Sequence, residues 1–195
     1  KHNSPNAAQE GNTYIYTTVK RHSYLFVAFA VGKWTQETCS QMMGDFKRTL
    51  RRPIKSEKIE IFTDGNDDYT YALPCFFKVR GLNYGQLVKI RDANGRLIRK
   101  EVRVVYGNSC IDEVETVNVE NFNSILRERV GRLVRKTKCF SKKKLRLVCA
   151  IDLFMFYWNF MSELKRGLTP AIMEDCATCI WSWHDFYYSA ITHLN

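Results

Sequence analysis

The order of strand-like and helix-like segments is the feature that most constrains how this chain folds. Aromatic and β-branched residues fill positions 14–19 and 24–31, and the polar run at 20–23 separates them, which predicts two antiparallel strands. Apolar residues then recur at helical spacing after Thr35, a plausible N-cap, until Pro53 stops the pattern. The chain therefore begins with a strand, a second strand and a helix.

The same alternation continues through the rest of the chain. Strands are expected at 58–63, 84–90 and 97–106, the last two joined by the turn signal Asp92-Ala93-Asn94-Gly95. Helical patterns cover 117–136 and 144–164, and a short segment follows near 181–190. These elements predict a mixed sheet flanked by helices, in an α/β or α+β domain. The polar, turn-rich residues 1–11 are expected to form an N-terminal loop, and residues 12–195 the domain itself.

Composition sets bounds on this domain. The chain has 195 residues, of which 45% are hydrophobic and 13% aromatic, which suits one domain with a sizeable core. No apolar run reaches the roughly 18 to 20 residues that span a bilayer, and no signal segment opens the chain. Seven cysteines, an odd number without a framework of close pairs, fit reduced thiols. A cytoplasmic protein that does not enter the membrane is therefore expected.

The cysteines themselves support two interpretations. Five of them are expected to be small core residues: Cys39, Cys75, Cys110, Cys139 and Cys149. Cys176 and Cys179 form the one C-x-x-C motif, with His184 and His193 downstream. Because a zinc site usually needs a second close pair, ordinary packing is favoured over a metal site in this segment.

The charge of the chain indicates its class of partner. Thirty Lys and Arg residues against twenty Asp and Glu residues give a net charge of +10, which favours nucleic acid or, less well, an anionic membrane surface. A membrane-surface protein would need a strongly amphipathic helix, which the sequence lacks. Neither a phosphate-binding Gly-rich motif nor a nucleophile elbow occurs, so nucleotide-driven enzymes and hydrolase triads are unsupported.

Two carboxylates are the candidate catalytic residues. Asp64 follows a predicted strand, where ligands of sheets flanked by helices tend to bind, and Glu120 lies near the start of a predicted helix. Phosphodiester chemistry uses two Mg²⁺ ions roughly 3.5 to 4 Å apart, and these ions prefer carboxylate oxygens. The alternative is structural: an Asp before Gly commonly forms a turn, and a Glu near a helix start complements the helix dipole.

A dense basic segment follows Glu120. Ten positive charges fall within the twenty residues 127–146, and residues 127, 131 and 135 would share one helical face if the helix continues. A solvated basic face is the plain interpretation. Phosphate contacts explain such a density better when it adjoins a candidate metal carboxylate.

At this point the chain resembles the DDE transposases of insertion sequences, specifically the family of insertion sequence one, from about Gly11 to the region of Trp181. Seven ordered blocks carry the resemblance: Val27-Ala28-Phe29-Ala30-Val31-Gly32, Phe62-Thr63-Asp64-Gly65 with Tyr69, Asn83-Tyr84-Gly85-Gln86-Leu87-Val88-Lys89, Val119-Glu120-Asn121-Phe122-Asn123, Cys139-Phe140-Ser141-Lys142, Tyr157-Trp158-Asn159-Phe160 and Leu168-Thr169-Pro170-Ala171.

The resemblance implies a ribonuclease-H-like fold and an activity. An Asp, an Asp and a Glu of such a fold bind two Mg²⁺ or Mn²⁺ ions and catalyse DNA cleavage and strand transfer, and Asp64 and Glu120 match the second and third acids. It also implies DNA as partner, both transposon ends and target, a homo-oligomeric assembly, and association with the nucleoid. The residues expected to contact DNA are Lys89, Asn123, Arg127, Arg132, Arg135, Lys136 and Lys142.

The chain departs from the family pattern at its start. In the family the first acid lies on a strand that precedes the strand matching 14–19, so this acid is expected upstream of Lys1. The family's N-terminal zinc-binding and helix-turn-helix region has no counterpart in this sequence either. Two hypotheses follow: a transposase catalytic core, or a non-catalytic DNA-binding or assembly module derived from one.

Overall fold

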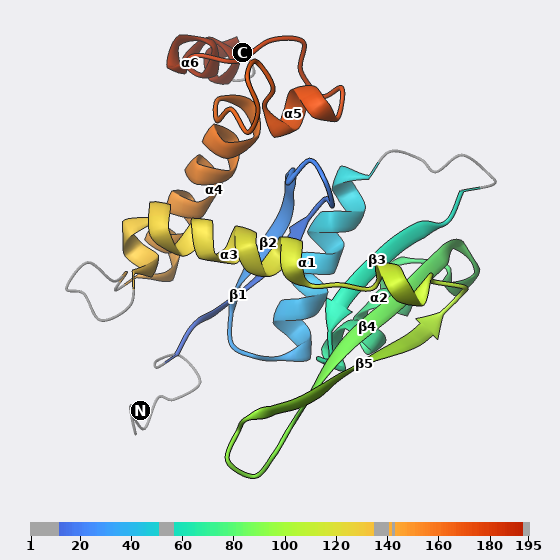
Figure 1. Ribbon diagram of the computed structural model, residues 1–195. Coiled ribbons are helices and arrows are strands. Elements are labelled where there is room, and N and C mark those ends of the chain that lie inside the picture. Colours follow the sequence, from blue (N-terminus) through green and yellow to red (C-terminus); the bar gives the residue numbers. More distant parts are fainter. Residues whose placement is uncertain (1–11, 51–56, 135–140, 142, 193–195) are drawn as a thin grey trace. The chain divides into compact units, whose positions relative to one another are not determined.

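The computed structural model describes residues 12–50, 57–134, 141 and 143–192 (Figure 1). The chain divides into two compact units. The first comprises Lys1–Thr18 and Val27–Glu120, and the second comprises Val19–Phe26 and Asn121–Asn195. Each unit is built from both early and later parts of the sequence.

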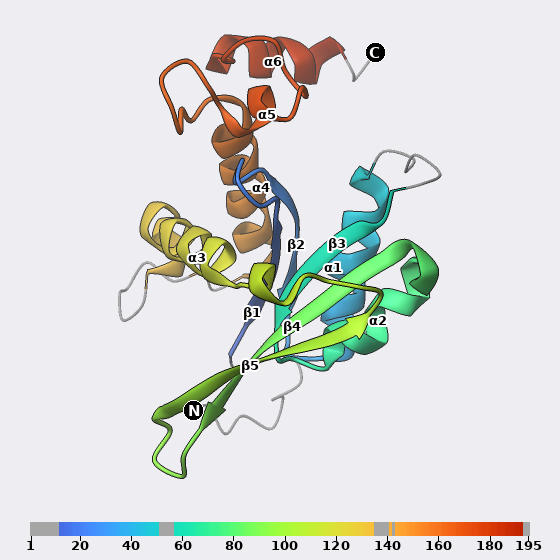
Figure 2. The same cartoon turned by 45° about the vertical axis from the view of Figure 1, so that its right-hand side comes forward.

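The first unit is an α/β structure. Strands β1 (Tyr14–Val19) and β2 (Phe26–Gly32) form a two-stranded sheet, and β3 (Ile59–Asp64), β4 (Leu82–Arg91) and β5 (Leu97–Tyr106) form a mixed three-stranded sheet in the order β3-β4-β5. β3 pairs parallel with β4, and β4 pairs antiparallel with β5. Helices α1 (Gln36–Thr49) and α2 (Asp68–Phe76) cover one face of the three-stranded sheet (Figures 1 and 2).

One core joins both sheets of this unit to the two helices. Its buried residues come from β1, β2, β4, α1 and α2, and Ile59 and Ile61 of β3 pack against it. Thr35 caps α1 as expected: its side chain accepts a hydrogen bond from Thr38 N at 3.4 Å. The apolar stripe of α1 that the sequence predicts, including Met42 and Phe46, is the part of that helix that enters the core.

Helix α2 is one of the elements that the sequence pattern did not predict. It is only nine residues long and contains Pro74, which has no N–H to donate to the carbonyl of Thr70. Tyr106 of β5 donates its hydroxyl to this carbonyl instead, at 3.0 Å. A donor from a distant strand therefore makes a proline tolerable inside the helix, which local propensity alone disfavours.

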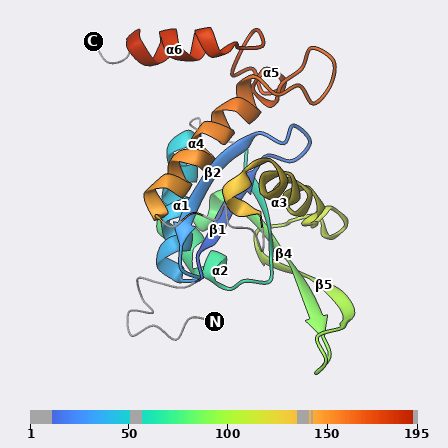
Figure 3. The same cartoon turned by 90° about the vertical axis from the view of Figure 1, so that its left-hand side faces the viewer.

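The second unit consists mainly of helices. Its elements are the part of α3 (Val117–Arg129) beyond Glu120, a 3₁₀ turn at Gly131–Leu133, α4 (Lys144–Phe160), α5 (Pro170–Met173) and α6 (Trp183–Thr192), all visible in Figure 3. Within this unit, hydrogen bonds tie α4 to the segment Val19–Phe26, which belongs to the same unit. Asn159 exchanges two bonds of 2.8 Å with the backbone of Phe26, and Trp158 Nε1 donates to Tyr24 O at 2.8 Å.

The predicted strands β1 to β5 and helices α1, α3 and α4 are confirmed, with changes at their ends. Helices α2 and α5 were not predicted, and the segment expected near 181–190 without a structural type is helix α6. β5 has the predicted bounds, whereas β2 begins at Phe26 rather than at residue 24. The predicted helix over 117–136 ends early, at Arg129, because Val130 adopts an extended backbone (φ −93°, ψ 95°) before Gly131, a poor helix former. The helix predicted over 144–164 ends at Phe160.

Candidate active site

Asp64 is the last residue of β3, and its side chain is exposed. Its Oδ1 accepts a hydrogen bond from Asn66 N at 3.2 Å, which is the turn-forming role expected for an Asp before Gly. That role occupies one lone pair of one oxygen. The carboxylate therefore keeps acceptor capacity for a further partner.

The pairing register decides which face of the sheet Asp64 points to. Side chains alternate between faces along a strand, and paired residues share a face. Thr63 pairs with Gln86, and both lie on the face covered by the helices: Thr63 Oγ1 lies 2.9 Å from the hydroxyl of Tyr84, and Gln86 Nε2 donates to Thr70 Oγ1 of α2 at 3.3 Å. Asp64, one residue further, therefore points to the opposite face.

Lys89 lies on the same face as Asp64, close to it along the neighbouring strand. Asp64 pairs with Leu87, and Lys89 follows Leu87 by two residues, a rise of roughly 7 Å. Lys89 Nζ forms an ion pair with Glu120 Oε1. Asp64 and Lys89 thus lie on one face of the sheet, and Glu120 contacts that face through Lys89.

Glu120 reaches this face from the first turn of α3. Thr116 Oγ1 donates to its Oε1 at 2.7 Å, and Lys89 donates to the same oxygen. These hydrogen bonds, the one from Lys89 first, hold the pKa of the Glu120 carboxyl below its usual range, and the charges of Lys89 and Lys100 add to this. Glu120 is therefore ionised well into mildly acidic solution.

Gly85 leaves room for the segment that leads to Glu120. A Cβ at Gly85 would stand 2.6 Å from Val114 Cγ2, so the segment before α3 crosses the sheet in direct contact with the backbone of β4. Val114 is buried there, and Thr116 follows it. The glycine in the middle of a strand thus has a positional purpose, which is the close approach of another backbone.

The groups on the helix-covered side near Asp64 are unsuited to ionise. Burial raises the pKa of the Cys39 thiol to about 12, with contributions from the charges of Asp68 and Asp64. Burial also raises the pKa of Tyr69, and the charge of Asp64 adds to it. Cys39 is therefore no candidate nucleophile, and the ionised groups of this region are the exposed carboxylates.

Asp64 and Glu120 are two of the carboxylates on this face, and Glu60, which pairs with Asn83 and accepts a hydrogen bond from its Nδ2 at 3.4 Å, lies on the same face four residues before Asp64. Among the residues whose positions are described, no group of three or more His, Cys, Asp or Glu side chains is arranged to hold a metal ion. Asp64 and Glu120 are nevertheless oxygen ligands of the type that Mg²⁺ and Mn²⁺ prefer, and Mg²⁺ needs few protein ligands because it keeps several waters. For Glu120 to take a cation, its ion pair with Lys89 would have to open.

The hairpin of β4 and β5 adds basic residues to the same face that the sequence analysis missed. Lys100 pairs directly with Lys89, and Arg91 lies two residues beyond Lys89. Like charges directly opposite one another destabilise a sheet unless an anion compensates them. Lys89, Arg91 and Lys100 were visible in the sequence as basic residues, but only the register of β4 with β5 places Lys100 opposite Lys89.

The other residues predicted to bind DNA belong to the second unit. Asn123 is half-buried on α3, and Arg127 and Arg132 are exposed. Arg132 lies in the 3₁₀ turn, so the expectation that residues 127, 131 and 135 share a helical face is wrong beyond Arg129. Arg135, Lys136 and Lys142 lie outside the described residues.

The cysteine predictions were right for one residue and wrong for three. Cys39 is buried in the first core, whereas Cys75, Cys110 and Cys149 are exposed, because each lies on the outer side of a helix or in a loop where the sequence gives no strong periodicity. Cys176 and Cys179 are exposed and belong to no metal-binding group of the described residues. Cys139 and His193 lie outside the described ranges.

Comparisons with known proteins leave the family open. No protein-family model, no curated protein and no solved structure matches this chain. Of the helices in the described ranges, none combines the length and apolar character that a membrane crossing requires.

Proposed function

We propose that this chain is the catalytic core of a DNA transposase of the DDE type, which cleaves DNA and transfers a strand with the help of Mg²⁺ or Mn²⁺. The observation that carries the proposal is that Asp64 and Lys89 lie on the same face of the paired strands β3 and β4, and that Lys89 forms an ion pair with Glu120. The two acids are 56 residues apart in sequence, and neither the turn at Asp64 nor the helix dipole at Glu120 requires them to share a face.

Each side chain has a distinct task in the proposed reaction. Asp64 and Glu120 bind the divalent ions, which when bound neutralise charge at phosphorus and activate a water or a 3′-hydroxyl. Lys89 holds Glu120 in position, and if Glu120 took an ion, the Lys89 ammonium would be free to contact the phosphate backbone. Lys100 and Arg91, on the same face, bind flanking phosphates and fix the register of the DNA strand.

The strand order also supports a ribonuclease-H-like fold. The resemblance places the first acid on a strand that precedes β1. In the described part of the chain, β1 pairs only with β2, and β3 pairs only with β4, so one edge of each is open in the first unit. A strand between them would join both sheets and bring a third carboxylate toward Asp64, completing the ligands for two ions.

The basic segment of the second unit is proposed to bind transposon-end or target DNA. Its described members, including Arg127, Arg132, Lys144 and Arg146, are exposed. Duplex DNA releases counterions when such side chains neutralise its phosphates, which favours binding at low salt. Assembly as a homo-oligomer and location at the nucleoid belong to the same proposal.

A second candidate function is a DNA-binding or assembly module without catalysis. The engagement of Glu120 by both Lys89 and Thr116 favours it, because a carboxylate satisfied by protein donors needs no cation. The two candidates predict the same DNA binding and differ only in chemistry.

Strand transfer by single variants separates the two candidates. Duplexes made from the DNA that flanks the coding sequence, carrying a free 3′-hydroxyl, are incubated with the chain, Mn²⁺ and a plasmid target. We expect Asp64→Asn and Glu120→Gln to abolish joining and to leave duplex binding unchanged, whereas Asp67→Asn, an exposed Asp in the same loop, keeps both. Binding without joining in the unaltered chain would exclude the catalytic proposal for this chain.

A further inference from the structure

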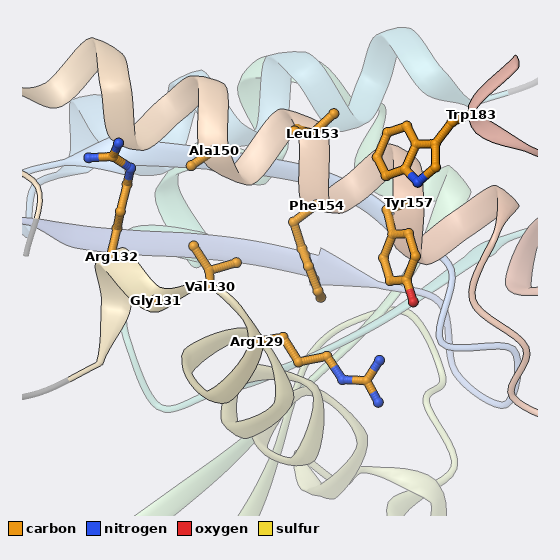
Figure 4. Close-up of a pocket in the computed structure, with 9 residues that line it drawn as sticks. All are labelled: Arg129, Val130, Gly131, Arg132, Ala150, Leu153, Phe154, Tyr157 and Trp183. Atoms are coloured by element: carbon orange, nitrogen blue, oxygen red, sulfur yellow. The ribbon is translucent and has the colours of Figure 1, made fainter. Parts of the chain in front are cut away.

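A groove of about 560 Å³ opens on the second unit, separate from the residues that form the candidate active site (Figure 4). Its volume is in the range of about 300 to 1,000 Å³ that holds small organic ligands. Its lining comes from the end of α3, the 3₁₀ turn, α4 and the start of α6: Arg129, Val130, Gly131, Arg132, Ala150, Leu153, Phe154, Tyr157 and Trp183.

The charged residues of the groove are both arginines. Figure 4 shows Arg132 at one end, and Arg129 extending toward the end that holds Tyr157 and Trp183. Within the part of the chain that the structure describes, neither arginine has a carboxylate partner, and Arg129 lies 5.9 Å from the ring centre of Trp158. The groove therefore presents positive charge at both ends without an acid in its lining, which complements an anion with more than one charged group.

The floor between the arginines is apolar and ends in two aromatic rings. Tyr157 and Trp183 are nearly parallel, with 13° between their planes and 6.3 Å between their centres. In Figure 4 the rings lie next to one another and are seen from the same side. Trp183 is 46% exposed although it lines a groove, so its ring offers stacking surface that the protein itself does not cover.

We propose that this groove binds a short unpaired stretch of DNA, with a base stacked on Tyr157 and Trp183 and with phosphates on Arg129 and Arg132. Flat aromatic rings beside cationic side chains are the combination that holds single-stranded nucleic acid, because bases stack on the rings while the cations follow the backbone. A duplex keeps its bases inside its stack and cannot use the rings. The proposal rests on the proposed function only in naming DNA as the polyanion.

The test measures binding of three labelled probes to the full chain. The probes are a ten-nucleotide thymidine strand, the same strand with abasic sites at its four central positions, and a ten-base-pair duplex. The variants are Trp183→Ala, Trp183→Phe, Tyr157→Ala and Arg132→Ala. Matched controls are Tyr187→Ala, an aromatic 63% exposed on the same helix outside the groove, and Arg166→Ala, an exposed arginine elsewhere in the second unit.

We expect Trp183→Ala to weaken binding of the thymidine strand about 5-fold to 150-fold, the range for removal of one base–aromatic stack. Trp183→Phe should recover most of this affinity, and duplex affinity should not change. The unaltered chain should bind the abasic strand as weakly as Trp183→Ala binds the intact strand. Arg132→Ala should weaken all strands that enter the groove and reduce the salt dependence, whereas both controls bind as the unaltered chain does.

Three outcomes would overturn the proposal. The first is equal binding of intact and abasic strands by the unaltered chain. The second is an equal decrease in affinity in Trp183→Ala and Tyr187→Ala. The third is unchanged strand binding in Trp183→Ala together with a change in sedimentation, which would assign the groove to contact with a second copy of the chain.

The outcome is independent of catalysis. Asp64→Asn and Glu120→Gln should bind the thymidine strand as the unaltered chain does, so a failed strand-transfer assay leaves the groove proposal standing. Conversely, Trp183→Ala keeps Asp64 and Glu120, so a loss of strand binding in this variant says nothing against the proposed catalysis.

Discussion

The two faces of the β3–β4–β5 sheet differ in burial and charge: one packs against helices, and the other presents charged side chains to solvent. Ile61, Tyr84 and Gln86 point toward α1 and α2 and are buried or packed against the core. Asp64 and Lys89 point the other way, toward solvent and Glu120. Because adjacent residues serve opposite faces, a substitution on one face should change stability and a substitution on the other should change chemistry.

The largest expected effect is on the helix-covered face. Tyr84 is fully buried and its hydroxyl lies 2.9 Å from Thr63 Oγ1, so Tyr84→Ala should lower the free energy of unfolding by about 3 to 5 kcal/mol. Lys89→Met, on the same strand but the other face, should cost about 1 kcal/mol or less because the ion pair is half-exposed. Urea unfolding of both variants measures the two changes in the free energy of unfolding. Similar decreases in the two variants would show that residues on the solvent-facing side contribute to stability as much as those on the helix-covered side.

A second substitution tests how closely the chemical face depends on packing. Gly85→Ala places a methyl group 2.6 Å from Val114 Cγ2, and overpacking of this kind costs about 1 to 3 kcal/mol. It should also displace the segment that carries Thr116 and so reduce strand transfer.

Val114→Ala provides the control for this clash. It removes both methyl groups and leaves the new Cβ 3.5 Å from Val114 Cβ, an ordinary van der Waals separation. The double variant should therefore be more stable than the sum of the two single effects predicts, by a measurable coupling energy. Strict additivity in urea unfolding would mean that Val114 does not press on Gly85.

The strands and helices could be predicted from sequence because their periodicity is local, and this held for β5 and for the capped start of α1. Helix α2 escaped prediction because its proline is compensated by Tyr106, thirty-six residues away along the chain from the carbonyl it satisfies. Asp64 and Glu120 could be chosen from the sequence because each is a carboxylate at the end of a predicted strand or near the start of a predicted helix. The role of Lys100 was not found, since only the register of β4 with β5 places it opposite Lys89.

A smaller effect is expected on the charged face when one cation is removed. Lys100→Ala should reduce the slope of log affinity against log salt by roughly 0.9 for each phosphate that is no longer neutralised, and weaken duplex binding uniformly across sequences. Arg99→Ala is the matched control, because Arg99 is the next residue, points to the other face and is already paired with Glu101 at 2.5 Å. Fluorescence anisotropy between about 50 and 200 mM salt resolves the difference. Equal slopes for the two variants would remove Lys100 from the DNA-binding face.

The smallest expected effect is a pH dependence of stability that separates Glu120 from the other carboxylates. Because its pKa in the folded chain lies below the ordinary 4.5, the ionised form stabilises the fold above that pH, and the contribution is lost as pH falls through the folded value. Glu120 is 52% exposed, so the contribution should be about 0.5 kcal/mol or less. Many other carboxylates titrate in the same pH range, and therefore the informative quantity is the difference in stability between the unaltered chain and Lys89→Met.

Since Lys89 is the first cause of the lowered pKa of Glu120, its removal should raise that pKa. The stability of Lys89→Met should then fall less with decreasing pH than the stability of the unaltered chain does. If urea unfolding at about pH 7 and at successively lower pH values below 4.5 gives the same decrease in stability for both proteins, the Lys89–Glu120 pair is not formed in solution. The two acids would then be able to take a cation without displacing the lysine.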